Sequence, residues 1–223
     1  MNLKLKKYLT LISEHLELFD NKGKGTIEIV MDPTIIQYEE VKIKEKFKEK
    51  KLPKSFGDIG VIGEDPYFIV VRDLVEFPNG RKGGYLRLIE RSSLNNGQAV
   101  AVLPIYADKV VLIKTFRHGT RNWELEIPRG FGENGISPEE NAKKELQEET
   151  GLSTSKLTLL GKFNSDTSIR SSNVMVYHAK IEEFSQSIAN DEEAISGIIF
   201  LEKKEFENKI IRGDIIDVFT ISA

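Results

Sequence analysis

The amino-acid sequence, 223 residues long, predicts an α+β protein. Short β-rich runs are separated by polar turns, and helical segments stand before, among and after them without the regular strand-helix alternation of a parallel α/β fold. The apolar fraction of 39% is typical of a globular protein with a buried core. The sequence has no cysteine, which excludes disulfides and thiolate metal sites.

Charge gives no sign of a large polyanionic partner. The 32 basic residues nearly balance the 35 acidic ones, and the formal net charge is −3. We therefore expect neither a nucleic-acid partner nor a membrane partner. Residues 1–19 have a basic start, but Glu14 and His15 interrupt the apolar stretch, and no cleavage site follows. The sequence predicts a soluble, cytoplasmic protein.

The N-terminal region predicts two helices and one short strand. Apolar residues recur at three- and four-residue intervals over residues 3–18, which predicts an amphipathic helix. A β-branched run at 26–31 predicts a strand, and residues 33–51 predict a second helix that Pro53 ends. The lysine-rich stretch at 42–54 favours a solvated helix face over a basic patch for a partner.

The sequence pattern changes near residue 55, from helical spacing to short β-rich runs, and this change predicts a domain boundary there. We assign residues 1–55 to no family and expect them to form a small α/β extension of unknown role, and residues 56–223 would form the main domain. Three polar turns separate the β-rich runs after residue 60 and predict antiparallel hairpins: Pro78-Asn79-Gly80, Asn95-Asn96-Gly97 and Ala107-Asp108.

The C-terminal half alternates helices and strands irregularly. We expect a helix at 137–150, strands at 157–163, 174–179 and 198–201, a helix at 203–212 and a short helical tail after Gly213. The first of these helices has Ser137 and Glu140 as a capping box and Gly151 as a C-cap.

Three glutamates share one side of this helix. Glu145, Glu148 and Glu149 stand at i, i+3 and i+4, where like charges repel each other. They also lie at the helix C-terminus, where the dipole favours cations. A solvated surface is the plain alternative, but hard carboxylate oxygens next to a diphosphate suit Mg²⁺, with Mn²⁺ as the substitute.

The stretch Gly130-Phe131-Gly132-Glu133-Asn134-Gly135 also fits the G-x-G-x-x-G dinucleotide motif. That motif requires an acidic residue about 20 positions further, at the end of a parallel strand, and a βαβ unit around it. Here that distance reaches only the end of the helix and its turn. We therefore reject the dinucleotide interpretation.

Residues 130–152 resemble the Nudix box, which runs glycine, five residues, glutamate, seven residues, then Arg-Glu-apolar-x-Glu-Glu-x-Gly-apolar. Aligned without gaps, the matching residues are Gly130, Glu145, Leu146, Glu148, Glu149, Gly151 and Leu152. Ile136 replaces the first glutamate of the pattern, and Lys144 replaces the arginine. The resemblance implies that those two family side chains form a salt bridge that supports the loop.

The resemblance extends over about residues 60–215, and these residues are similar to the ADP-ribose pyrophosphatase branch of the family. It implies a Nudix α/β/α sandwich with a mixed sheet. It further implies substrate contacts by Arg117 and Glu126. The metal ligands implied are the Arg129 carbonyl, Glu145, Glu148 and Glu149. Arg117 alone would equally fit an ordinary strand-end arginine on the surface.

The activity implied is metal-dependent hydrolysis of a nucleoside diphosphate linked to another group, most simply ADP-ribose or a related nucleotide sugar. Glu148 or Glu149 would relay a proton, or a loop carboxylate, Glu192 or Glu193, would act as general base. Those loop residues also fit a solvated turn. Trp123 could stack on the base, although a core or dimer contact fits as well.

Two further expectations remain open. A NUDIX-like module that binds a nucleotide for regulation, without turnover, is the alternative function, and Ile136 and Lys144 weakly favour it. We also expect a homodimer that pairs through the strands of residues 67–91, because that hairpin would otherwise expose an apolar edge. Residues 1–55 could cover this edge instead.

Overall fold

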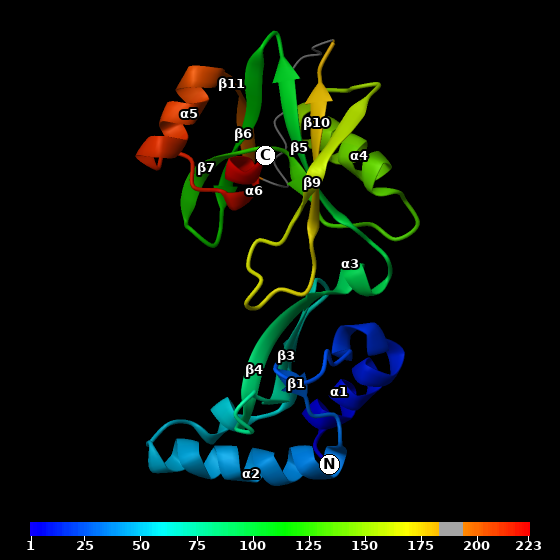
Figure 1. Ribbon diagram of the computed structural model, residues 1–223. Helices are drawn as coiled ribbons and strands as arrows, with labels where there is room; N and C mark the ends of the chain where they lie inside the picture. Colours follow the sequence, from blue (N-terminus) through cyan, green and yellow to red (C-terminus); the bar gives the residue numbers. More distant parts are fainter. Residues whose placement is uncertain (183–193) are drawn as a thin grey trace. The chain divides into compact units, whose positions relative to one another are not determined.

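The structure, a computed structural model, describes residues 1–182 and 194–223. It divides into two compact units, one of Met1–Leu94 with Asp166–Ser172 and the other of Asn95–Ser165 with Asn173–Ala223 (Figure 1). The division therefore follows Leu94, whereas the sequence suggested a boundary near residue 55. The reason is that the strands of residues 60–90 pair with one another and pack on the N-terminal helix.

The first unit combines two main helices with a small antiparallel sheet. Its helices are α1 (Leu3–Glu14), α2 (Pro33–Glu49) and α3 (Arg91–Leu94), with 3₁₀ turns η1 (Leu16–Phe19) and η2 (Lys54–Gly57). Its strands are β1 (Glu28–Ile29), β2 (Gly60–Glu64), β3 (Phe68–Glu76) and β4 (Lys82–Glu90). The Asp32 side chain caps α2 by accepting hydrogen bonds from two backbone N–H groups. The first helix ends earlier than expected, and a separate 3₁₀ turn follows it.

The strand β3 organises this sheet. It pairs with β4 along its whole length, and with β2 and β1 over shorter stretches. The hairpin expected at Pro78-Asn79-Gly80 is confirmed, with Gly80 at φ 78°, a conformation that favours glycine. Residues 166–172 also run beside β4, where Leu88 N donates to Ile169 O at 2.7 Å.

The second unit contains a mixed sheet. Its strands are β5 (Ala99–Tyr106), β6 (Lys109–Arg117), β7 (Asn122–Glu126), β8 (Arg129–Gly130), β9 (Leu157–Phe163), β10 (Val174–Lys180) and β11 (Ile195–Glu202). The order is β11-β6-β5-β10-β9, with β10 parallel to β5 and the other pairs antiparallel. The hairpin predicted at Asn95-Asn96-Gly97 is wrong, because β4 pairs with β3 and these residues connect the two units.

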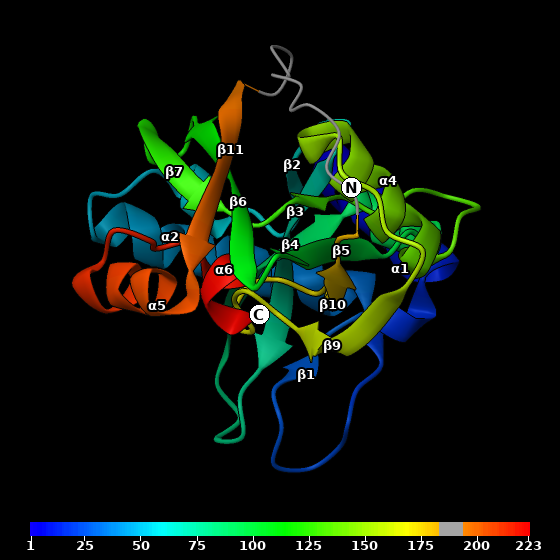
Figure 2. The ribbon, with the colours of Figure 1, turned by 90° about the horizontal axis from the view of Figure 1, so that it is seen from above.

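Helices cover both faces of this second sheet, as Figures 1 and 2 show. On one face α4 (Pro138–Thr150) packs through Ala142 and Leu146 against apolar side chains of β5 and β6. On the other face α5 (Lys203–Arg212) and α6 (Val218–Ser222) pack through Phe206, Ile210 and Phe219. The α/β/α sandwich with a mixed sheet is therefore confirmed. Within the described ranges, no helix has the length and apolar character needed to cross a bilayer.

Candidate active site

The helix α4 fixes the three glutamates in place. Ser137 accepts a hydrogen bond from Glu140 N, and the Glu140 carboxylate accepts one from Ser137 N at 2.9 Å. Gly151 ends the helix at φ 69°. Both predicted caps are confirmed, so Glu145, Glu148 and Glu149 lie on one rigid helix.

The strands β5 and β6 separate beyond the turn that joins them, and a later part of the chain passes between them. β5 and β6 pair only beside their turn, where Ile105 meets Val110. Beyond that point β7 pairs with β6 and β8 pairs with β5. The residues between β7 and β8 therefore cross from one strand to the other, and Pro128 O accepts a hydrogen bond from Val102 N at 2.9 Å.

Two of the three glutamates contact the strand β8. Glu149 is 4% exposed and accepts a hydrogen bond from Arg129 N at 2.9 Å. The Glu145 carboxylate lies so close to Gly130 that a Cβ atom there would overlap it. Only glycine at position 130 therefore allows this approach, which explains the glycine that begins the motif.

Glu148 differs from its two neighbours. Its side chain is 53% exposed and forms an ion pair with the Lys144 ammonium at 3.8 Å. An exposed carboxylate beside the half-buried Glu145 and the buried Glu149 is accessible to a ligand from solvent. Glu148 is therefore the glutamate of the three that can change partners at least cost.

Arg117 and Glu126, both predicted to bind substrate, contact each other. Glu126 is buried, and its carboxylate accepts hydrogen bonds from Arg117, whose Nε contacts the two oxygens at 3.0 Å and 2.9 Å and whose Nη2 contacts one of them at 2.6 Å. It accepts two more from Arg129. Burial alone would lower the pKa of the Arg117 guanidinium, but hydrogen bonds with Glu126 outweigh it and raise that pKa. The two arginines thus hold Glu126 between them, and their contact with substrate stays a prediction.

The C-terminal segment also reaches this cluster, which the sequence did not predict. The Asp217 carboxylate lies 3.6 Å from the Arg129 guanidinium, which stacks on the Phe219 ring at 4.3 Å. The Thr220 hydroxyl accepts a hydrogen bond from Ile127 N at 3.0 Å. Burial raises the pKa of Asp217 although Arg129 opposes this. These contacts join segments far apart in the chain, so no local pattern indicates them. The sequence predicted only the helical tail after Gly213.

Asn141 is a second residue that sequence reasoning missed. It is buried, and its Nδ2 donates to Phe131 O at 2.9 Å, which ties α4 to the loop after β8. Its Oδ1 accepts no hydrogen bond in the described part of the protein. Gly132 belongs to the same loop and lies so close to the backbone at Gln98 that a side chain would not fit. An asparagine within a helix carries no pattern that indicates such a role.

The two departures from the Nudix box are explained by a different ion pair. Lys144 contacts the Glu133 carboxylate, in the same loop that contains Ile136. The hydrogen bond with Glu133 raises the pKa of Lys144. The loop therefore keeps a salt bridge to position 144, with its acidic partner three residues earlier than in the pattern.

Trp123 and two loop glutamates complete the set of predicted residues. Trp123 is 45% exposed and contacts Phe116 edge-on with ring centroids 5.6 Å apart, so the core alternative for Trp123 is wrong. Glu192 and Glu193 lie outside the described residues.

The donor set fits a hard divalent cation. Carboxylates of Glu145, Glu148 and Glu149, with the Arg129 carbonyl, are oxygen ligands of the type that Mg²⁺ prefers. In the part of the chain that the structure describes, no three acidic or histidine side chains are already gathered at metal-binding distance. The close approach of the Glu145 carboxylate to Gly130 places this carboxylate beside the strand that supplies the Arg129 carbonyl.

Comparison with known proteins decides the family. A family model described as NUDIX domain matches residues 95–218, which include β5, the loop and α4. The chain belongs to the NUDIX family. It is 31% identical over 135 residues to the ADP compounds hydrolase NudE of Escherichia coli (strain K12), a match that covers 60% of this chain and 70% of that protein.

Two further relatives agree with this membership. The ADP-ribose pyrophosphatase of Bacillus subtilis (strain 168) is 38% identical over 90 residues, 40% of this chain and 45% of the relative. A crystal structure of an ADP compounds hydrolase has a TM-score of 0.62 at 26% identity and covers 74% of this chain and 87% of that chain. The protein is a NUDIX pyrophosphohydrolase, and enzymes of this family use divalent cations.

Proposed function

We propose that this NUDIX enzyme hydrolyses the pyrophosphate bond of ADP-ribose or a closely related nucleotide sugar, with Mg²⁺ as its cation. The observation that carries the proposal is the contact between α4 and β8, in which Glu149 bonds to Arg129 N and Glu145 lies against Gly130. Both contacts lie within residues 95–218, which match the NUDIX family model. The relatives, named as an ADP compounds hydrolase and an ADP-ribose pyrophosphatase, support the substrate class.

The reaction consumes one water. Its oxygen bonds to one phosphorus, the bond from that phosphorus to the bridging oxygen breaks, and the bridging oxygen leaves on the other phosphate. From ADP-ribose the products are AMP and ribose 5-phosphate. Bound Mg²⁺ would neutralise the diphosphate and lower the pKa of the attacking water.

The side chains of the chain itself have distinct roles in this proposal. Glu145, Glu148, Glu149 and the Arg129 carbonyl would hold the cation. Exposed Glu148 would accept the proton of the water, with Glu192 and Glu193 as the alternative bases. Arg117 would contact a phosphate with the donors that Glu126 leaves available, because Glu126 already fixes the plane of its guanidinium.

The test is phosphate release by the purified full chain, coupled to a phosphatase, on ADP-ribose, other sugar nucleotides and dinucleoside polyphosphates. We expect the fastest release from ADP-ribose or an ADP-sugar, and none in EDTA. The Glu149→Gln variant is the control. Tight binding of ADP-ribose without release above that variant would contradict the proposal and favour the regulatory alternative.

We also propose that the protein is a homodimer. Tyr67, Tyr85 and Leu86, all on or beside the β3–β4 hairpin, remain exposed, at 62%, 37% and 37%. The alternative is that other parts of the same chain cover this hairpin. The structure shows part of such a cover, because α1 packs on the first sheet and residues 166–172 run beside β4.

A further inference from the structure

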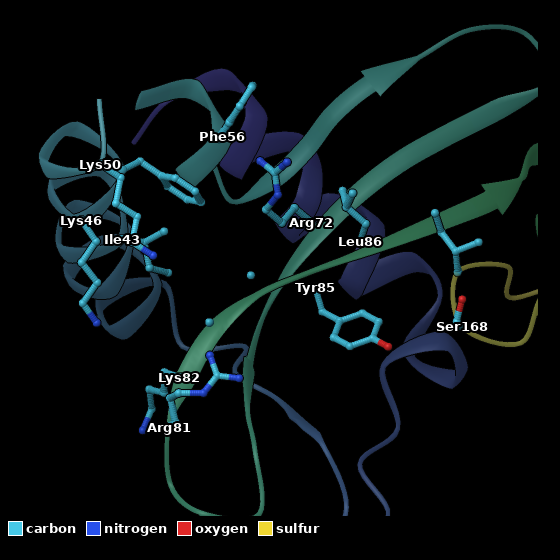
Figure 3. A pocket seen from close by; sticks show the side chains of 14 residues that line it. Ile43, Lys46, Lys50, Phe56, Arg72, Arg81, Lys82, Tyr85, Leu86 and Ser168 are labelled. Carbon is cyan, nitrogen blue, oxygen red and sulfur yellow. The ribbon is translucent and has the colours of Figure 1, made fainter. Parts of the chain in front are cut away.

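The first unit contains a hollow of about 880 Å³ between α2 and the strands β3 and β4 (Figure 3). This volume lies in the range of small-molecule sites. All of its lining residues belong to the first unit, whereas the three glutamates belong to the second. The hollow is therefore separate from the candidate active site in its composition.

The lining is strongly cationic. Among the residues that the structure describes, no acidic side chain lines the hollow, whereas five basic ones do, namely Lys46, Lys50, Arg72, Arg81 and Lys82. Of these, Lys82 pairs with Glu76. The other four form no ion pair with any residue that the structure describes. Such a concentration of unpaired cations raises the local positive potential in a protein whose overall charge is negative.

Arg72 is held in place while most of its donors stay available. One nitrogen of its guanidinium donates to the backbone carbonyls of Ser55 and Asp58, at 3.4 Å and 3.0 Å. Its stem crosses Gly84, where a Cβ atom would lie 2.7 Å from Arg72 Cδ. Burial lowers the pKa of Arg72, and the charge of Asp58 offsets this only in part, so the guanidinium is desolvated without forming a salt bridge to a described residue.

Apolar side chains complete the hollow. On α2 the residues Ile43, Lys46 and Phe47 share one helix face by their spacing, and Lys50, the C-cap of the helix, continues it. Phe56 is 49% exposed and contacts Phe47 edge-on, with centroids 6.1 Å apart. Figure 3 shows Lys46 and Lys50 on the helix side and Arg72 and Arg81 on the sheet side. A ligand seated there would meet cations from both sides and an aromatic wall.

We propose that this hollow binds a small organic phosphate, an anion that carries at least two phosphate charges and an apolar or aromatic part. The cations select phosphate, which arginine binds bidentately, and Phe56 with Phe47 contacts the organic part. This proposal does not depend on the substrate of the active site.

The test is calorimetric titration of the full chain in EDTA with ADP, fructose 1,6-bisphosphate and inorganic pyrophosphate. EDTA removes the cation through which the active site would hold a diphosphate. We expect one site per chain for ADP, and weaker binding of fructose 1,6-bisphosphate, whose organic part is a hydroxylated sugar without an aromatic ring. Arg72→Gln and the pair Lys46→Gln with Lys50→Gln should each weaken binding about tenfold or more.

The matched control is Lys48→Gln with Lys54→Gln, which removes two nearby charges that pair with Glu45 outside the hollow. It should bind as the wild type does. Equal weakening in this control, or no binding of the three compounds, would overturn the site. Pyrophosphate binding as tightly as the organic compounds would overturn the role of the aromatic wall, and binding of a short RNA alone would overturn the ligand class.

Discussion

Glu148 and Glu149 are neighbours in the chain but lie in different surroundings. Glu149 is buried and accepts a backbone hydrogen bond, whereas the Glu148 side chain is 53% exposed. We expect Glu148→Gln and Glu149→Gln each to lower kcat about a hundredfold or more, because each loses a carboxylate charge that the reaction needs. Steady-state kinetics at saturating Mg²⁺ measure this.

The two variants should differ in stability. Glu149→Gln weakens a charge-assisted hydrogen bond in a buried position and should cost about 1 to 3 kcal/mol, whereas Glu148→Gln should change the free energy of unfolding little. Chemical denaturation of both variants separates loss of activity from loss of fold. Near wild-type turnover in either variant would remove that residue from the site.

The Lys144–Glu133 ion pair leads to a second prediction at this scale. Lys144→Arg alone should do little, since its partner Glu133 stays in place. Ile136→Glu alone adds a second carboxylate beside Glu133 without another cation. The two changes together should be more favourable than their sum by about 0.5 to 3 kcal/mol, because the arginine can bind both carboxylates. Additive unfolding free energies would show that positions 136 and 144 do not interact.

At the scale of elements, Asp58 joins both N-terminal helices to the start of β2. It accepts hydrogen bonds from Lys4 of α1 and Lys44 of α2. Burial alone would raise the pKa of Asp58, but these two hydrogen bonds outweigh it and lower that pKa. A carboxyl whose pKa is lower in the folded protein stabilises the fold above its unfolded pKa of about 3.9.

We therefore expect the first unit to lose this stabilisation as the pH falls through the lowered pKa of Asp58. Asp58→Asn should be less stable than the wild type at pH 7, and the difference should shrink below about pH 4. Denaturation of the full chain at several pH values measures it. Asp214→Asn, in the other unit, is the control, and an unchanged difference between pH 7 and pH 3 would contradict the prediction.

The sequence predicted those elements whose signals are local. The caps at Ser137 and Gly151 and the hairpin turn at Gly80 depend on neighbours within a few residues, so their type and position followed from the pattern. The turn at Asn95-Asn96-Gly97 has the same local chemistry, yet it joins two units. The strand β4 pairs instead with β3, in a sheet that packs on α1, and the turn residues do not encode this pairing.

The residues of the candidate site also fall into those that the sequence predicted and those that only the fold shows. The spacing of the three glutamates identified the helix face, and the resemblance supplied Arg117, Glu126 and Arg129. The contacts of Phe219 and Thr220 with this cluster join residues about 90 positions apart, as the bond from Ile127 to Thr220 shows. No periodicity or motif reports such a contact, so only the folded chain shows it.

At the scale of the whole molecule, the expected outcome is a homodimer of 25.3 kDa chains. Exposed Tyr67 and Tyr85 on the β3–β4 hairpin would gain burial against a second copy, and a symmetric pair covers an edge that would otherwise favour aggregation. Light scattering should give twice the chain mass. Tyr67→Lys with Tyr85→Lys should give the mass of one chain, whereas Tyr38→Lys, on α2 and equally exposed at 62%, should leave the dimer intact. A wild-type mass of one chain would contradict the dimer and show that the chain's own helices and residues 166–172 cover the hairpin sufficiently.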